Sequence, residues 1–165
     1  MSNLKPALIL FSHGSLLCGA GETLREHAER LRATEEYLAV EYGYLNYSLP
    51  SFEEAAERCA AAGAVQIVVV PYFLVSGKFV REDLPPRIEA ARREHPQIEF
   101  ILAEPLGFHE EMTAAVLEMA AMARPPEHWR HDMLAAPDFC AHRPDCPLFG
   151  SPICPVTAEA TGGHP

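Results

Sequence analysis

VQIVVVPYFL, residues Val65–Leu74, is the stretch of this chain that best indicates its fold. Its β-branched and aromatic residues are typical of strands, and its nearly continuous apolar character predicts burial on both faces of a sheet. Two more apolar runs are Ala7–Phe11 (ALILF) and Ile98–Leu102 (IEFIL), and Tyr42–Ser48 (YGYLNYS) is a weaker fourth. We therefore expect four strands in a largely buried sheet.

Amphipathic stretches alternate with these runs and predict four helices. The first covers Glu22–Tyr37, and the second begins after Ser51, which forms a capping-box pattern with Glu54, and ends at Gly63. The apolar positions at helical spacing are Leu24, Ala28, Leu31 and Leu38; Phe52, Ala55, Ala56, Cys59 and Ala60; Leu84, Ile88 and Ala91; and Met112, Val116 and Met119. This alternation predicts an α/β fold of the flavodoxin-like class, a parallel four-stranded sheet with helices on both faces.

The composition is that of one globular domain with a packed core. The chain has 165 residues, of which 48% are hydrophobic, 22% charged and 8% aromatic. Its 13 Lys and Arg against 23 Asp and Glu give a formal net charge of −10, which argues against a nucleic-acid binder. The first apolar run is far shorter than the roughly 20 residues of a membrane span, and no signal-peptide pattern is present. We therefore expect a cytoplasmic protein without a membrane partner.

A change in composition near residue 125 divides the chain. Residues 1–124 contain 7 of the 15 prolines, whereas residues 125–165 contain 8, together with three of the 5 cysteines. We predict an α/β domain over 1–124 and an irregular extension rich in proline and cysteine over 125–165. An odd number of cysteines in a chain large enough to fold without cross-links argues against a disulfide framework.

Open α/β sheets bind ligands beyond the carboxyl ends of their strands, so the residues after each apolar run are the first site candidates. Ser12-His13-Gly14-Ser15 follows the first run. A histidine there can accept a proton or ligate a metal, because imidazole ordinarily titrates near neutrality. The alternative is a structural histidine bonded to a loop carbonyl. The glycines that follow do not match a phosphate-binding loop.

The loop after Val65–Leu74 has the composition of an anion-binding segment. Flexible Gly77 is accompanied by the cations Lys78 and Arg81, which suit an anionic ligand. For Glu82 and Asp83, we favour a role in capping the next helix, where acidic residues complement the helix dipole.

Three segments, in this order and spacing, resemble a known family. They are Leu8–Ser15 (LILFSHGS), Val69–Pro85 (VVPYFLVSGKFVREDLP) and Glu104–Gly107 (EPLG). Between residues 5 and 123 the chain resembles the sirohydrochlorin chelatases, the short cobaltochelatase and ferrochelatase type of the class II chelatase superfamily. The middle segment is the specific one, because HGS alone is weak evidence.

The resemblance implies a chelatase-like fold and an enzyme that inserts cobalt or iron into the tetrapyrrole sirohydrochlorin, on the way to cobalamin or sirohaem. It implies no nucleotide, and it implies that two copies of the short chain pair as a homodimer. His13 would be both catalytic residue and metal ligand, because insertion requires loss of two pyrrole N–H protons and transient metal coordination. The residues expected to bind substrate are Ser12, Gly14, Ser15, Ser76, Gly77, Lys78, Phe79 and Arg81.

The chain departs from the family pattern at three positions. Phe79 stands where members commonly carry a second histidine, and Asn46 and Leu49 stand where they carry acidic residues. Phenylalanine cannot bind a metal or accept a proton, although it can stack on a macrocycle. Either His13 suffices, or another residue substitutes, or the protein binds a tetrapyrrole or metal without insertion. The candidate substitutes are Glu22, His27 and His109.

The extension carries a second candidate site for a metal or cluster. Its potential ligands are Cys140, Cys146, Cys154 and His142. Thiolates suit an iron–sulfur cluster or zinc, and some longer members of the resembling family carry a cysteine-bearing extension that binds such a cluster. A fourth ligand would come from Cys18, His142 or another subunit. Reduced thiols on a disordered tail are the alternative.

Two hypotheses for function therefore stand. The first is a homodimeric chelatase that acts on sirohydrochlorin, and its rival is a non-catalytic carrier or sensor of a tetrapyrrole or metal. A response-regulator or flavin-binding domain is weaker, because the acidic cluster for magnesium chemistry and any flavin signature are missing from the sequence. The metal stays open among cobalt, iron and nickel, since one imidazole accepts all three.

Overall fold

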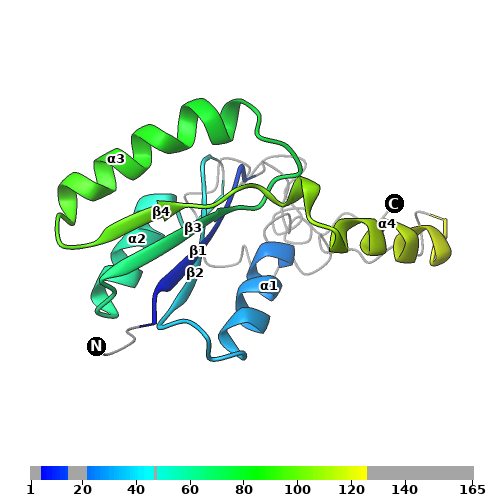
Figure 1. Cartoon of the computed structure of the whole chain (residues 1–165), viewed down its shortest axis with the longest axis horizontal. Helices are drawn as coiled ribbons and strands as arrows, with labels where there is room; N and C mark the ends of the chain where they lie inside the picture. Colours follow the sequence, from blue (N-terminus) through cyan, green and yellow to red (C-terminus); the bar gives the residue numbers. More distant parts are fainter. Residues whose placement is uncertain (1–4, 15–21, 47, 126–165) are drawn as a thin grey trace, which may run out of the picture.

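A computed structural model describes residues 5–14, 22–46 and 48–125, which form a four-stranded sheet with helices on both faces (Figure 1). In chain order the elements are β1 (Ala7–Ser12), α1 (Glu22–Arg32), β2 (Val40–Tyr44), α2 (Phe52–Ala61), β3 (Gln66–Pro71), the π-helical turn η1 (Phe79–Asp83), α3 (Leu84–Glu94), β4 (Glu99–Leu102), the 3-10 turn η2 (Leu106–Phe108) and α4 (Glu111–Ala121). The predicted alternation of strands and helices is confirmed. Within the described residues, no helix is long and apolar enough to cross a membrane.

The sheet is entirely parallel, with the strand order β2-β1-β3-β4. β1 lies in the middle, so that Leu10 is in register with Tyr42 on one side and Val70 on the other. The predicted burial of both faces is correct for β1, in which Ala7 to Phe11 are all buried. In β3 only alternate residues are buried, because the face that carries Val68 and Val70 is less completely covered.

Two apolar clusters join the helices to opposite faces of the sheet. On one face, α2 and α3 cover a core that includes Phe11, Phe52 and Phe100. On the other face, α1 packs Leu24 and Ala28 against β1 and β2. Burial of these side chains is the main driving force for folding, worth about 1.5–3 kcal/mol for each large apolar side chain. The sheet thereby becomes a rigid base for the loops that leave its carboxyl edge.

The capping box predicted at the start of α2 is present. The Ser51 hydroxyl accepts a hydrogen bond from the Glu54 backbone N–H at 3.2 Å, and the Glu54 carboxylate accepts one from the Ser51 N–H at 2.7 Å. On the buried face of this helix, Cys59 is fully enclosed, and burial raises the pKa of its thiol to about 12. Cys59 is therefore a core residue, as its position on the apolar face predicted.

Two predicted boundaries are wrong. β2 covers Val40–Tyr44 instead of Tyr42–Ser48, because Ser51, the N-cap of α2, follows closely after the strand. α1 ends at Arg32 instead of continuing to Tyr37, since Glu35 adopts a left-handed conformation with φ of 56° that no helix allows. Leu38 consequently lies outside the helix and is 47% exposed.

The last helix, α4, extends away from the sheet (Figure 1). None of its described side chains is buried, and three of its large apolar residues, Val116, Leu117 and Met119, are 59–67% exposed. Ile101 on β4 is likewise 39% exposed. The described part of the chain therefore presents an apolar helix and an incompletely covered edge of the sheet.

We predict that Ser51→Ala lowers the free energy of unfolding by about 1 kcal/mol, because it removes an N-cap that α2 needs to satisfy its first backbone donors. The change is measured by urea denaturation followed by far-ultraviolet circular dichroism. Ser51→Thr keeps a capping hydroxyl and should retain most of the stability. An equal loss in both variants would contradict a capping role for the hydroxyl.

Candidate functional site

The backbone of His13 is held at the carboxyl edge of the sheet by the loop that follows β2. The carbonyl oxygens of Ser12 and His13 accept hydrogen bonds from the N–H groups of Leu45 and Asn46, each at 2.9 Å. Gly14 then turns with φ of +86°, and a Cβ added there would lie 1.8 Å from the Asn46 carbonyl oxygen. Only glycine fits at this position, so the close packing of the loops after β1 and β2 explains why a glycine follows His13.

Nδ1 of His13 has a hydrogen-bond partner in its own loop. Nδ1 lies 2.9 Å from the Gly14 carbonyl oxygen, which can only accept a hydrogen bond, so Nδ1 carries the proton. In the neutral ring, Nε2 then has the lone pair needed to accept a proton or ligate a metal. The contact with a loop carbonyl matches the structural alternative raised from the sequence, and it also orients the ring for chemistry at Nε2.

Phe79 packs directly against the His13 ring. The two ring centroids are 4.3 Å apart with an interplanar angle of 40°. Phe79 also contacts Phe73 at 6.1 Å, and Phe73 contacts Phe11 of β1 at the same distance. These aromatic contacts connect the loop after β3 to the core and place an apolar ring beside the imidazole, at the position where a second histidine was expected from the resemblance.

The polar residues of the loop after β3 pair among themselves. Lys78 Nζ lies 3.0 Å from Asp83 Oδ1, and this contact raises the pKa of Lys78, which stays cationic at neutral pH. Arg81 Nε donates to the Ser76 hydroxyl at 3.2 Å. Gly77 accepts from the backbone N–H groups of Val80 and Arg81, which closes the turn. Both cations are exposed at this edge.

The predicted capping role of Asp83 is wrong. Asp83 stands at the N-cap position of α3, but its side chain makes no capping hydrogen bond. Its carboxylate accepts from Lys78 instead. The reason is that Pro85 and Pro86, which follow at the positions a cap would serve, have no backbone N–H, and the Leu84 N–H already donates to the Phe79 carbonyl.

A cleft of about 650 Å³ opens beside this loop. Its lining residues are Leu45, Asn46, Glu53, Lys78, Phe79, Glu82, Asp83, Pro86, Arg87 and Ala90. Arg87 crosses it, donating to the Glu53 carboxylate at 2.6 Å and to the Leu45 carbonyl oxygen at 3.2 Å. The cleft has the size of a small-molecule site and borders Phe79, although His13 is not one of its lining residues. Neither Arg87 nor Glu53 was singled out from the sequence, because their pairing joins two helices.

Two apolar side chains stand exposed at the same edge. Leu74 and Val75 follow β3 and are 62% and 71% exposed. Their backbone is fixed by the Glu104–Gly107 segment, since the Leu106 N–H donates to the Phe73 carbonyl and a Cβ on Gly107 would lie 1.7 Å from the Leu74 carbonyl oxygen. The third motif thus supports the loop that carries Phe79. An exposed apolar pair beside cations suits a ligand with both an apolar body and anionic groups.

The candidate substitutes for a second histidine have other contacts. His27 on α1 packs against Tyr72, with ring centroids 5.5 Å apart, and burial raises the pKa of that tyrosine. His109 accepts a hydrogen bond from the Glu111 backbone N–H at 3.3 Å near the start of α4. The side chain of Glu22 lies outside the described residues. Asn46 and Leu49, where acidic residues were expected, form the turn before the cis Leu49–Pro50 bond.

Several predicted residues lie outside the described part of the chain. They are Ser15 and Cys18 near His13, and Cys140, His142, Cys146 and Cys154 in the extension. The described residues bring together His13, Phe79, Ser76, Gly77, Lys78 and Arg81 on the two loops at the carboxyl edge. What this arrangement offers chemically is one oriented imidazole, an aromatic face and two cations.

The comparisons with known proteins identify the family. A family model described as CbiX matches residues 7–123. The chain is 31% identical over 116 residues to the sirohydrochlorin cobaltochelatase of Sulfolobus acidocaldarius, with 70% of this chain and 90% of that protein covered. It is 27% identical over 113 residues to the sirohydrochlorin ferrochelatase of Bacillus subtilis, of which it covers 43%. The chain thus spans nearly all of the short relative and less than half of the longer one.

Solved structures agree with this assignment. A CbiX protein of cobalamin (vitamin B12) biosynthesis from Marinobacter aquaeolei superposes with a TM-score of 0.60 at 30% identity, over 70% of this chain and 94% of that one. SirB from Bacillus subtilis with Fe3+ gives a TM-score of 0.66 at 27% identity, over 74% of this chain and 49% of that one. The likeness confirms the chelatase-like α/β fold.

We predict that Gly14→Ala lowers the stability by about 1–3 kcal/mol, because the new methyl group would collide with the Asn46 carbonyl and strain a left-handed residue. The matched control is Gly77→Ala, where a Cβ would meet only the Val75 side chain at 4.0 Å. Thermal and urea unfolding of both variants check the prediction. Equal stability of the two variants would contradict the close packing of the loops after β1 and β2.

Proposed function

The chain belongs to the CbiX family, and on that basis we propose that it is a metal chelatase that inserts cobalt or iron into sirohydrochlorin. The observation that carries the proposal is the position of His13, oriented through Nδ1 at the carboxyl edge of the sheet in a chain whose relatives bear the name of this activity. The metal ion is a substrate of this reaction, and the reaction needs no nucleotide.

His13 would perform the proton and metal steps of insertion. Two pyrrole N–H protons must leave the macrocycle as the metal enters, and a neutral imidazole nitrogen can accept a proton or hold the metal before transfer. The hydrogen bond from Nδ1 to the Gly14 carbonyl keeps the ring from rotating and directs this chemistry to Nε2.

Phe79 would act on the macrocycle rather than on the metal. Its ring lies against His13 and is only half-buried, so an aromatic face is available beside the imidazole. A tetrapyrrole is flat and apolar in its centre, and stacking on an aromatic ring is worth about 0.5–1.5 kcal/mol beyond the buried area. The exposed side chains of Leu74 and Val75 extend this apolar surface.

Lys78 and Arg81 would bind the carboxylates at the periphery of sirohydrochlorin. Both side chains are exposed, and the Lys78–Asp83 pair lies at the surface, where solvent screening leaves an ion pair with little effect on stability. A substrate carboxylate can therefore replace the Asp83 carboxylate as the partner of Lys78 at little cost in free energy. Arg81 presents a guanidinium that can hold a carboxylate through two hydrogen bonds.

A non-catalytic carrier or sensor of a tetrapyrrole or metal is the second candidate function. It is favoured by Phe79, which cannot supply the second imidazole, and by Asn46, which cannot supply a carboxylate. His27 and His109 are engaged with Tyr72 and the start of α4. The rival predicts saturable binding of the macrocycle without faster metal insertion.

The proposal is tested by anaerobic absorbance spectroscopy of sirohydrochlorin with Co2+ or Fe2+. We expect the protein to accelerate insertion over the protein-free reaction, and we expect His13→Ala to reduce the rate by about a hundredfold or more, the usual contribution of a positioned acid–base group. His27→Ala and His109→Ala serve as comparison variants. A comparable loss in either would show that another residue substitutes for the second histidine.

Phe79→His separates the two candidate functions. In a chelatase that already works through His13, the added imidazole changes the rate little. In a binding protein that has lost insertion, it creates activity where the native chain has none. Binding of sirohydrochlorin by the native chain without any acceleration would overturn the catalytic proposal.

We further infer that two copies of the chain pair as a homodimer in the cytoplasm. Support comes from α4, whose Val116, Leu117 and Met119 are exposed, and from the exposed Ile101 of β4. A helix with this apolar surface is stabilised when a second copy covers it, and two equivalent contacts follow from two-fold symmetry. The proposed iron–sulfur or zinc site at the extension cysteines stays a prediction from the sequence.

We predict that Leu117→Glu converts the dimer to a monomer, because a carboxylate cannot be buried in an apolar interface without a partner. The molar mass is measured by light scattering after size-exclusion chromatography. Ala114→Glu places the same charge between Glu111 and Glu118 and should leave the dimer intact. A native chain that is monomeric at micromolar concentration would contradict the homodimer.

A further inference from the structure

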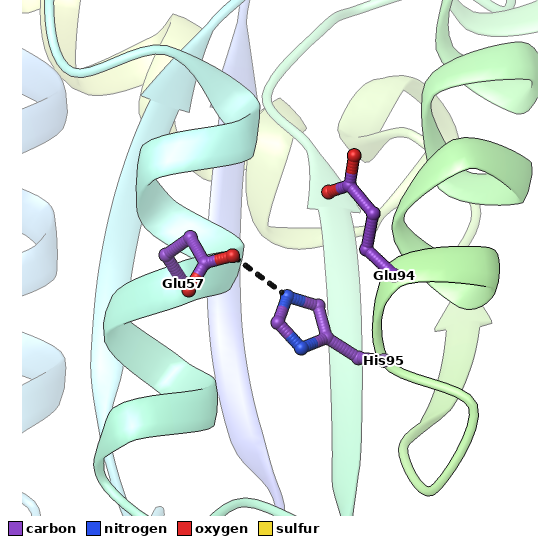
Figure 2. Close-up of side chains that lie close together, drawn as sticks. All are labelled: Glu57, Glu94 and His95. Carbon is purple, nitrogen blue, oxygen red and sulfur yellow. Dashed lines mark ion pairs between the residues drawn. The ribbon is translucent and has the colours of Figure 1, made fainter.

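Three metal-binding side chains gather on the α2 and α3 side of the molecule, away from His13. Glu57 belongs to α2, Glu94 is the last residue of α3, and His95 follows it. Figure 2 shows all three projecting into the space between the two helices. His95 precedes β4, whereas His13 follows β1, so in this parallel sheet the cluster lies toward the opposite edge from His13.

The spacing of these groups suits one metal ion. One ligand atom from each residue can be chosen so that all lie within 4.8 Å of one another, and His95 Nε2 is 3.1 Å from Glu57 Oε1. Two ligands bound about 2.1 Å from a tetrahedral metal are themselves about 3.4 Å apart. The His95–Glu57 pair, at 3.1 Å, lies within a few tenths of an ångström of that separation, and Glu94 is an exposed side chain that can close the remaining distance by rotation.

His95 is held in place before any ion arrives. Its backbone N–H donates to the Ala91 carbonyl at 2.8 Å and ends α3, and its carbonyl accepts from the Ile98 N–H at 2.9 Å. The imidazole is 13% exposed, so packing restricts its rotation, whereas the Glu57 carboxyl group extends to the surface. A fixed imidazole with two adjustable carboxylates lowers the entropy lost when a metal binds.

The charge of the cluster favours a dication. A metal binds through the two carboxylates and through the deprotonated form of the imidazole, so the ligand set as a whole is anionic. Two arginines near the cluster in the sequence pair with other carboxylates, Arg58 with Glu41 and Arg92 with Glu89. An imidazole combined with carboxylates is the donor set of zinc, cobalt and ferrous iron, whereas magnesium and calcium prefer oxygen ligands alone.

We propose that Glu57, Glu94 and His95 form a second divalent-metal site, selective for ions such as Zn2+ or Co2+, with water completing the coordination. An ion there joins the end of α3 to α2. Because the site lies apart from His13, metal bound there is not the metal being inserted. The proposal is independent of the chelatase activity, which depends on the opposite edge of the sheet.

The test uses the full chain, stripped with a chelator and titrated with Zn2+ by equilibrium dialysis. We expect Glu57→Gln and His95→Gln each to remove one bound equivalent at low micromolar metal, through a weakening of about tenfold or more. Glu36→Gln is the matched control, since it removes an exposed carboxylate outside the cluster and should keep the full stoichiometry. In parallel, backbone amide signals of residues 57, 94 and 95 should shift with Zn2+ in the native chain.

Two results would overturn the proposal. One is an unchanged stoichiometry in Glu57→Gln. The other is the absence of any zinc-dependent shift at residues 57, 94 and 95. Either result would reduce the cluster to an ion pair between His95 and Glu57. Metal insertion into sirohydrochlorin is measured separately, so loss of that activity bears only on the His13 proposal.

Discussion

The hydrogen bonds that join the carboxyl end of β1 to its neighbours control the rest of the site. On one side the Ser12 and His13 carbonyls accept from the β2 loop, and on the other the Phe11 carbonyl accepts from Tyr72 at 2.7 Å. Because the β1 residues Ala7 to Phe11 are buried, these bonds form in surroundings where an unpaired carbonyl would be costly. The loops therefore have little freedom to separate, and His13 stays where the loops after β2 and β3 converge.

This constraint makes some groups of the site rigid and leaves others adjustable. The imidazole is fixed by main-chain contacts, the aromatic ring of Phe79 is fixed by packing on the core, and the cations are held only by exposed ion pairs. The rigid groups are those proposed to face the reacting centre of the macrocycle. The adjustable groups are those proposed to meet its peripheral carboxylates, where exchange of partners costs least.

Sequence patterns predicted the elements that local rules determine. The order of strands and helices followed from apolar runs, and the Ser51–Glu54 cap and the position of His13 after β1 followed from spacing. The end of α1 was missed because Glu35 adopts a left-handed conformation without the glycine that signals it. Asp83 was misassigned because the prolines at 85 and 86 leave a capping side chain no N–H to accept from. Pairs such as Arg87 with Glu53, and His95 with Glu57, depend on the packing of α2 against α3, which no local pattern encodes.

The central claim is that the Gly14 carbonyl holds the Nδ1 proton of His13, so that Nε2 is the nitrogen that accepts a proton or binds a metal. Long-range proton–nitrogen NMR correlation of the histidine ring signals, assigned with His13→Gln, measures the tautomer directly. The account predicts a neutral His13 ring protonated at Nδ1, with a change at Nε2 when Zn2+ is added as an inert substitute for the substrate metal. A ring protonated at Nε2 and unchanged by metal would contradict it.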